Sequence, residues 1–360
     1  MKKILYVLTV VFVCFIASNN LYSQPVITVQ NGENVRFFNN LQVAIDSAES
    51  GSSIYLTGLQ GNDYLLNGNI SINKKIHLYG TGHYPDSTTA TGRFIIGGHL
   101  NIQSGSDSGS VYGLTINGNL YIGGDVNNFY FSRSFVKSTF YLGGSESDTV
   151  RNVTISESVF IGYLYAYNVK NIVFKKNIFE STIRDFDNQT AFVNNVFLRN
   201  AYSWYGVTYT LIGIEYCLFE NNVFLNKSIT HPGCLGCFLY DCNYNIFNNN
   251  IFNYGVSFPQ GTNVGTNNIN DQPWDSIFVN QSVDPYHFRF NYGNDYHLKE
   301  TSPGKNAGTD STDIGIYGSS SPYKEGAVPP NPHFRKVSIK PDRVSDGILQ
   351  VEIEVEAQKK

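Results

Sequence analysis

Residues 174–197 read FKKNIFESTIRDFDNQTAFVNNVF and contain one short phrase twice, as Phe174-Lys-Lys-Asn177-Ile-Phe179 and as Phe192-Val-Asn-Asn195-Val-Phe197. The phrase is an apolar residue, two variable residues, Asn or Ser, one variable residue and an apolar residue. Four more copies begin at Phe131, Ile155, Phe219 and Phe247, so the six copies are 24, 19, 18, 27 and 28 residues apart. A repeat of this length indicates that each copy is one coil of a stacked solenoid.

Within each coil, short runs alternate apolar and polar residues, which predicts strands of three to five residues with one inward face. Asn, Gly and Ser lie between these runs and tolerate the left-handed backbone that sharp corners require. The Asn or Ser of the phrase should then stack from coil to coil at one corner, each side chain bonding the next coil. We interpret this column as scaffold; its members are Ser134, Ser158, Asn177, Asn195, Asn222 and Asn250.

The first 23 residues have the pattern of an export signal. The chain starts Met1-Lys2-Lys3, runs apolar from Ile4 to Ala17 and reaches a small residue at Ser23. The apolar run is shorter than the roughly 20 residues of a membrane span. We therefore expect an exported protein that is periplasmic, on the cell surface or extracellular, with no integral membrane span. The net charge of −4 and the lack of a basic run in the body of the chain argue against a nucleic-acid partner. Nothing specifies an oligomer, and a monomer is expected.

Four cysteines follow the signal: Cys217, Cys234, Cys237 and Cys242. An even number in an exported chain favours disulfides. Buried free thiols are one alternative. A metal site is another, because His231-Pro-Gly-Cys234-Leu-Gly-Cys237 resembles half of one, although the other two cysteines do not form a second close pair.

The segment from Tyr296 to Gly318 carries a family resemblance. It holds Leu298, then Ser302-Pro303, then Asn306-Ala-Gly308, then Asp313-Ile-Gly315. This order resembles the closing coil of exported right-handed parallel β-helix proteins of the pectate-lyase superfamily. The helix-like run Leu41–Ala48 before a strand resembles their N-terminal cap, and Asp310 and Asp313 are expected to form turns.

The resemblance implies an all-β protein with a right-handed parallel β-helix, a short N-terminal capping helix and a C-terminal β tail. The expected organisation is a signal peptide over residues 1–23, the β-helix over 24–320, and a linker with a β-strand tail over 321–360. Val351-Glu-Ile-Glu-Val-Glu356 alternates strictly and is the strand of that tail, and we expect it to pair with the edge of the β-helix. The superfamily includes lyases, hydrolases, epimerases and non-enzymes, so the resemblance does not select an activity.

The register of the coils predicts a surface strip. Ten residues after the leading residues of four consecutive phrases lie Tyr141, Tyr165, Arg184 and Tyr202, and twelve residues after them lie Gly143, Tyr167, Phe186 and Trp204. In Gly162-Tyr163-Leu164-Tyr165-Ala166-Tyr167 the small and aliphatic residues suit the interior, so the tyrosines should point outward. The neighbouring coils should lie about 4.8 Å apart, close to the repeat of a sugar chain. The candidate substrate-binding residues are Tyr141, Tyr163, Tyr165, Tyr167, Tyr202 and Trp204.

Two other interpretations of the strip stay open. Cross-strand aromatic pairs stabilise sheets, and an exposed aromatic patch can also bind another protein.

Charged residues near the strip are the candidate catalytic group: Arg184, Asp185, Asp187 and Lys176. In lyases of the resembled superfamily a Lys or Arg is the base and carboxylates hold calcium, so Ca²⁺ is a possible cofactor if the protein is a lyase. A surface ion pair is the other interpretation of the same residues, and the sequence favours it over a catalytic group. Three functions therefore follow from the sequence: polysaccharide binding or action at the cell surface through the strip, a polysaccharide lyase or hydrolase acting on an acidic glycan, and a structural adhesin or surface spacer.

Overall fold

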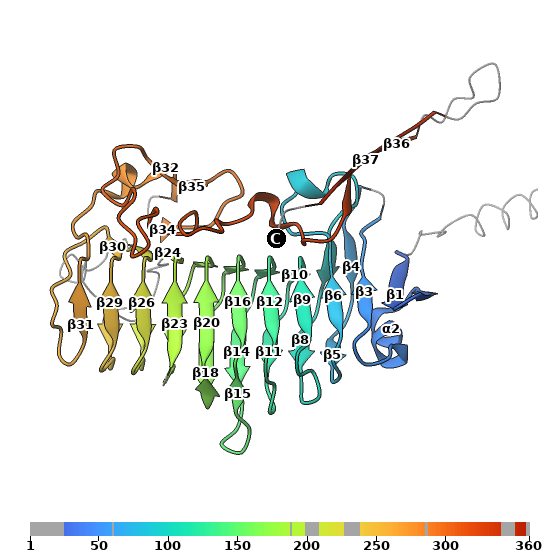
Figure 1. The fold of residues 1–360 in the computed structure, drawn as a ribbon, viewed down its shortest axis with the longest axis horizontal. Coiled ribbons are helices and arrows are strands. Elements are labelled where there is room, and N and C mark those ends of the chain that lie inside the picture. The colour runs from blue at the N-terminus through green and yellow to red at the C-terminus, as the bar shows by residue number, and fades with distance from the viewer. Residues whose placement is uncertain are drawn as a thin grey trace, which may run out of the picture.

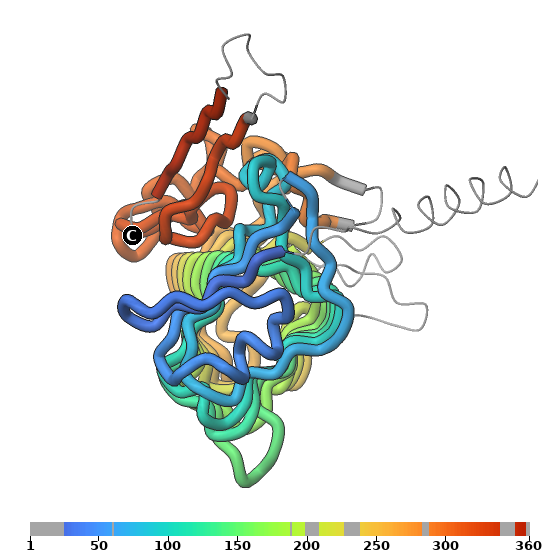
Figure 2. The backbone as a smooth tube through the Cα atoms, turned by 90° about the vertical axis from the view of Figure 1, so that its right-hand side faces the viewer, coloured from blue at the N-terminus to red at the C-terminus, as the bar shows by residue number. Residues whose placement is uncertain are grey.

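The protein is a parallel β-helix. A computed structural model describes residues 25–59, 61–187, 189–198, 209–226, 238–284, 287–339 and 350–357. Three long sheets of twelve, nine and eight strands run side by side along the molecule (Figure 1). In each coil the chain passes from the twelve-stranded to the nine-stranded and then to the eight-stranded sheet. Viewed along the stack, the coils superpose around one interior (Figure 2).

The strands are short, as the turn residues between them require. The twelve-stranded sheet contains, in spatial order, β2 (Asn34–Phe38), β1 (Ile27–Asn31), β3 (Ser53–Tyr55), β6 (His77–Tyr79), β9 (Ser110–Tyr112), β12 (Tyr130–Ser132), β16 (Thr154–Ser156), β20 (Ile172–Lys175), β23 (Thr190–Val193), β26 (Leu218–Glu220), β29 (Ile246–Asn248) and β31 (Val264–Thr266). The nine-stranded sheet contains β4 (Tyr64–Leu66), β7 (Phe94–Ile96), β10 (Thr115–Ile116), β13 (Phe135–Val136), β17 (Val159–Phe160), β21 (Ile178–Phe179), β24 (Val196–Leu198), β27 (Val223–Leu225) and β30 (Ile251–Phe252). The eight-stranded sheet contains β5 (Ile70–Ile72), β8 (Leu100–Ile102), β11 (Leu120–Ile122), β14 (Phe140–Gly143), β18 (Leu164–Tyr167), β22 (Ile183–Arg184), β25 (Leu211–Ile212) and β28 (Leu239–Tyr240). A further parallel pair, β15 (Val150–Arg151) and β19 (Val169–Lys170), lies in the turns that follow the eight-stranded sheet.

Stacked phenylalanines fill the interior because the same position of successive coils repeats an aromatic residue. Phe174, Phe192, Phe219 and Phe247 stack with ring centroids 4.7–4.8 Å apart. Each is fully buried. The coil spacing therefore matches the stacking distance of aromatic rings.

The predicted Asn and Ser column is confirmed as a buried ladder. Oδ1 of Asn222 accepts a hydrogen bond from the backbone N–H of Asn195 at 2.8 Å, and Oδ1 of Asn250 accepts one from Asn222 at 2.9 Å. The ladder continues to Asn268, which the sequence phrase did not include. Its residues satisfy the backbone donors at a corner where no strand partner exists.

The N-terminal end of the interior is covered as expected. Helix α2 (Leu41–Ser47) buries Leu41, Ala44 and Ile45, and the Asn40 side chain caps it by accepting a hydrogen bond from the Val43 N–H at 3.0 Å. The antiparallel pair β1 and β2 adds to this end, with β1 paired to β3.

The C-terminal part differs from the expected closing coil. The stack ends at β31, and the following segment runs back along the outside of the coils (Figure 1). It contains two antiparallel pairs, β32 (Phe278–Asn280) with β35 (Asp295–Leu298) and β33 (Val283–Asp284) with β34 (His287–Phe288), and the short 3₁₀ turns Trp274–Ser276 and Glu325–Ala327. A third 3₁₀ turn, Asp86–Thr88, precedes β7. Apolar side chains between positions 277 and 323 pack on the outward side chains of the nine-stranded sheet and form a second hydrophobic core. The C-terminal segment therefore covers this face of the β-helix.

The two aspartates of the resembled segment form turns, as expected. Oδ1 of Asp310 accepts hydrogen bonds from the backbone and hydroxyl of Thr312, and Asp313 accepts from the Asn306 N–H and pairs with Lys305. They help to fix the segment on the coils.

The tail forms a hairpin of its own. β36 (His333–Ile339) pairs antiparallel with β37 (Val351–Glu356), so β37 does not join the edge of the β-helix. The apolar and acidic residues of β37 alternate in a strand as predicted, but the strand pairs with β36 instead of the β-helix. Within the described ranges no helix has the length and apolar character that a membrane crossing needs. The residues predicted to form an export signal, 1–23, lie outside those ranges.

Candidate functional site

A column of outward side chains runs along the eight-stranded sheet. Strand pairing places Tyr141 opposite Tyr165 and Tyr165 opposite Arg184, which confirms the predicted register. The column extends to Tyr121, which the repeat phrase did not reach. The residue opposite Arg184 on the other side is Ile212 rather than Tyr202. Tyr202 and Trp204 both lie outside the described residues. In order the column is Ser71, Asn101, Tyr121, Tyr141, Tyr165, Arg184, Ile212 and Tyr240.

The rings of this column cover one another. Tyr121 and Tyr141 stack with centroids 5.0 Å apart and planes 7° apart, and Tyr141 and Tyr165 stack at 5.5 Å and 12°. The Arg184 guanidinium lies 5.4 Å from the Tyr165 ring centre, and the His99 ring meets Tyr121 edge-on. The flat faces that would stack on a sugar are thus occupied. The column stabilises the sheet and presents ring edges and hydroxyl groups to solvent.

Two tyrosines beside the column keep open faces. Tyr163 is 44 % exposed and Tyr167 is 49 % exposed. Tyr167 pairs in register with Gly143, and Gly123 precedes Gly143 on the same face of the neighbouring coil. The glycines leave a flat floor beside the Tyr167 ring, and at Gly143 a Cβ atom would come within 1.8 Å of the Tyr167 carbonyl oxygen. This glycine is therefore required by the close approach of the next coil.

Hollows lie on both sides of Tyr167 along the stack. The hollow on the N-terminal side is lined by amide, hydroxyl and glycine residues and by Tyr121, with Gly143 at its edge. The hollow on the C-terminal side is lined by Tyr167 itself, and its carboxylates are Glu146, Asp185, Asp187, Glu215 and Asp241. We call the two hollows together with Tyr167 the tyrosine groove.

Charge is uneven along the tyrosine groove. Burial raises the pKa of Asp187 above its usual value, and the nearby carboxylate of Glu215 raises it further. Nε of Arg184 is buried and makes no hydrogen bond with any residue of the described chain. The C-terminal hollow is thus lined by several carboxyl groups, and the pKa of one of them, Asp187, is raised.

The structure separates the candidate catalytic residues. Arg184, Asp185 and Asp187 lie together at the end of β22 and in the turn after it, where Asp185 has a positive φ of 62°. Phe186, which the register predicted to face outward, is fully buried and packs against Phe174 and Phe192.

Lys176 does not belong to this group. It follows β20 of the twelve-stranded sheet, at the corner that leads to the nine-stranded sheet. The structure does not bring Lys176 beside Arg184, because a turn, the strand β21 and a second turn separate the two residues around the coil.

A calcium site does not fit the described residues. No group of three or more His, Cys, Asp or Glu side chains in this part of the chain is arranged to hold a metal ion. The carboxylates of the acidic hollow come from four coils and are spread along it. We therefore derive no step through calcium.

The cysteines that the structure describes are free. Cys217 and Cys242 are buried, and their thiols donate to the carbonyls of Glu215 at 3.2 Å and Tyr240 at 3.3 Å. Burial raises the pKa of Cys217 to about 12 and that of Cys242 to about 11, so both stay protonated. The predicted disulfides are wrong for these two residues, and the alternative of buried thiols holds. Cys234 and Cys237 lie outside the described residues.

Neither a scan against protein-family models nor a search of curated proteins finds a match for this chain. The parallel β-helix expected from the sequence resemblance is present, whereas membership of the pectate-lyase superfamily stays an expectation. The functional argument therefore rests on the geometry of the site.

Proposed function

We propose that this protein is exported and binds a polysaccharide in the tyrosine groove, along the axis of the β-helix. The observation that carries the proposal is the half-exposed Tyr167 ring, which lines the C-terminal hollow and whose paired residue on the preceding coil, Gly143, lines the N-terminal hollow. Successive coils repeat at about 4.8 Å, so equivalent polar groups can meet successive sugars. Amide and hydroxyl groups at one end and carboxylates at the other suit the hydroxyl groups of a glycan.

The charge of the tyrosine groove restricts the class of glycan that can bind. Five carboxylates line the C-terminal hollow, and Arg184 is the cation of the adjacent column. An acidic glycan would be repelled from that hollow, because like charges at short range raise the free energy of binding. We therefore expect a neutral polysaccharide.

Replacing Tyr167 tests the groove. Tyr167→Ala should weaken glycan binding about tenfold, because stacking a sugar on an exposed ring is worth roughly 1–2 kcal/mol. Tyr167→Phe keeps the ring and should bind nearly as the wild type does. Affinity electrophoresis across a panel of neutral and acidic polysaccharides measures both.

The matched control is the pair Tyr216 and Tyr244. Both are 52 % exposed, and they stack on each other just before strands of the twelve-stranded sheet. Alanine at these positions should leave binding unchanged. Equal retardation of wild type and Tyr167→Ala by a bound glycan would contradict the proposal, and absence of binding across the whole panel would favour the structural spacer.

A second candidate is cleavage of the bound polysaccharide, and one observation favours it. Burial and the nearby carboxylate of Glu215 raise the pKa of Asp187, and acid–base hydrolysis needs a carboxyl group of raised pKa together with a second carboxyl group. If the hollow is catalytic, wild-type protein releases reducing ends and Asp187→Asn loses that activity, while Asp241→Asn keeps most of it. A lyase would instead produce unsaturated ends that absorb ultraviolet light. No product of either kind removes this candidate and leaves binding intact.

A further inference from the structure

A second groove lies on the outer face of the twelve-stranded sheet, beside the C-terminal segment. Its floor is formed by short side chains of that sheet, including Ser132, Val173 and Val193. One wall is made by corner residues of successive coils, and the other by Ser319, Ser321 and Pro330 of the C-terminal segment. Its aromatic end is Tyr112 and Tyr130, the last members of a tyrosine column that begins at Tyr55 and Tyr79. We call it the lysine groove.

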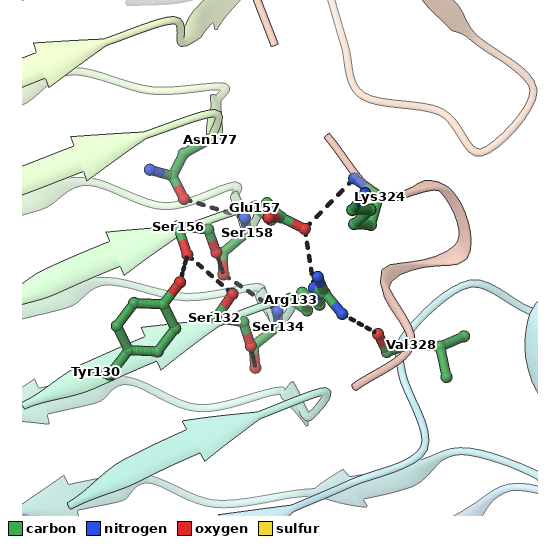
Figure 3. Close-up of polar contacts among 10 residues, drawn as sticks. All are labelled: Tyr130, Ser132, Arg133, Ser134, Ser156, Glu157, Ser158, Asn177, Lys324 and Val328. Atoms are coloured by element: carbon green, nitrogen blue, oxygen red, sulfur yellow. Dashed lines mark hydrogen bonds and ion pairs between the residues drawn. The ribbon is translucent and has the colours of Figure 1, made fainter. Parts of the chain in front are cut away.

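An ion pair fixes the two walls. Nε of Arg133 donates to Glu157 Oε2 at 2.8 Å, and a guanidinium N–H of Arg133 donates to the Val328 carbonyl at 2.7 Å (Figure 3). The backbone N–H of Lys324 also donates to Glu157 Oε2, at 3.4 Å. Arg133 and Glu157 are almost fully buried, and the Glu157 carboxylate is already paired with the Arg133 guanidinium.

Lys176 lines this groove without a partner. The residue is only 6 % exposed, yet its ammonium group makes no hydrogen bond or ion pair with any residue that the structure describes. Burial lowers the pKa of Lys176 to about 8, and the positive charges of Lys175 and Lys324 act in the same direction. The carboxylates of Glu157 and Asp310 offset part of this decrease in pKa, but neither forms an ion pair with the Lys176 ammonium. An anion that enters the groove could therefore form the direct charge-assisted hydrogen bond that this ammonium lacks.

The surrounding charge also suits an anion. Arg133, Lys175, Lys176 and Lys324 are four cations, against the two carboxylates Glu157 and Asp310, in a chain whose net charge is −4. The tyrosine hydroxyls and Ser132 add neutral hydrogen-bonding groups. This combination differs from the acidic end of the tyrosine groove.

We propose that the lysine groove is a second glycan site, which binds an acidic sugar unit with its carboxylate or sulfate group against the Lys176 ammonium. The two sites lie on different sheets, so the lysine groove does not depend on the function proposed for the tyrosine groove. A surface that takes neutral chains on one face and acidic chains on another could join two polysaccharides.

The neighbouring coils supply a structurally matched variant. Lys176 has a positive φ of 58°, and the equivalent corners of the next three coils are Asn194, Asn221 and Asn249, with φ of 53–56°. Lys176→Asn therefore suits the backbone and replaces the long cationic side chain with a short neutral amide. Lys176→Arg keeps the charge, and Lys170→Asn removes an exposed lysine outside the groove.

The test is calorimetric titration of the full chain carrying Tyr167→Ala, so that binding in the first groove is weakened. The probes are trigalacturonate, a sulfated chondroitin disaccharide and a neutral cello-oligosaccharide. We expect one or both acidic probes to bind and the neutral one not to bind. Lys176→Asn should lose at least about tenfold in affinity, as expected for a charge-assisted hydrogen bond. Lys176→Arg should retain most of it, and Lys170→Asn should behave as the parent.

The two acidic probes identify the anion that the groove binds. Binding of trigalacturonate alone would indicate a carboxylate, and binding of the chondroitin disaccharide alone would indicate a sulfate. Failure of both acidic probes to bind, equal binding of the neutral probe, or unchanged affinity in Lys176→Asn overturns the proposal. Loss of neutral-glycan binding in Tyr167→Ala with no change on Lys176→Asn would leave only the tyrosine groove.

Discussion

Asn222→Leu should destabilise the protein by about 3–5 kcal/mol, because it leaves several buried polar groups without partners at once. Asn222 is fully buried. Its Oδ1 accepts from the backbone and side-chain N–H groups of Asn195 at 2.8 and 3.0 Å, and its Nδ2 donates to the Phe192 carbonyl at 2.8 Å and to Asn250 Oδ1 at 3.0 Å. Leucine has a similar volume and can replace none of these bonds. Guanidinium-induced unfolding measures the change.

Serine at the same position is the matched comparison. Earlier coils use serine in the ladder: Oγ of Ser158 accepts from the Ser134 N–H at 3.1 Å. Asn222→Ser should therefore keep an acceptor for the Asn195 N–H and cost distinctly less than Asn222→Leu. If the two variants are equally unstable, or if Asn222→Leu costs less than about 1 kcal/mol, the polar ladder is not what holds this corner.

His83→Phe should change how stability depends on pH. His83 is fully buried between Phe135 and the C-terminal segment, with Nδ1 3.4 Å from the Tyr292 hydroxyl and no partner for Nε2 among the described residues. Burial lowers the pKa of His83 to about 3, and Arg93 contributes in the same direction. The unfolded chain takes up this proton near pH 6.5 and the folded chain does not. His83 therefore lowers stability as the pH falls from 6.5 towards 3.

Glu180 acts in the opposite direction beneath the same segment. Burial raises the pKa of Glu180 to about 7, although its carboxylate accepts a hydrogen bond from the Phe290 N–H at 3.1 Å. The folded chain holds this proton between about pH 4.5 and 7, so Glu180 lowers stability as the pH rises through that range. The two groups offset each other in the wild type.

Single variants should expose each contribution. When the pH is lowered from 7 to 5, the free energy of unfolding of His83→Phe should rise by about 2 kcal/mol relative to that of the wild type. The magnitude follows because one pKa unit corresponds to about 1.4 kcal/mol and pH 5 lies about 1.5 units below the usual pKa of histidine. Over the same decrease in pH, the free energy of unfolding of Glu180→Gln should fall relative to that of the wild type. Urea unfolding at the two pH values measures the differences. Parallel pH profiles for all three proteins would mean that neither group titrates under the C-terminal segment.

The repeat was readable because each coil sets its own local pattern. Tyr141, Tyr165 and Arg184 lie at a constant offset from the repeated phrase because the turns that join the nine-stranded sheet to the eight-stranded sheet in these coils, 137–139, 161–163 and 180–182, have equal lengths. That offset fails after Leu198, where the connection to β25 is longer, and Ile212 takes the expected place of Tyr202. Counting from a repeat thus predicts register only across turns of constant length.

Other features depended on contacts between distant segments. The apolar residues that follow β31 carry no sign that they will pack outside the coils rather than close them. Lys176 and Arg184 are close in sequence but lie on different sheets, because two corners of the coil intervene. A second ladder runs at another corner, where Asn245 Oδ1 accepts from the Cys217 N–H and Asn263 Oδ1 accepts from Asn245. Its last member, Asn263, lies between Gln260 and Gly265 and so lacks the flanking apolar residues that marked the first ladder.

The most direct test of the central proposal is chemical protection of tyrosines by a bound glycan. The protein is nitrated with tetranitromethane, with and without a saturating neutral polysaccharide selected from the panel, and the modified residues are quantified by mass spectrometry. Tyr167 and the control tyrosines Tyr216 and Tyr244 are about equally exposed in the free protein. We predict that the glycan slows nitration of Tyr167 several-fold and leaves Tyr216 and Tyr244 unchanged. Nitration of Tyr167 at the same rate in the saturated complex would contradict binding in the tyrosine groove.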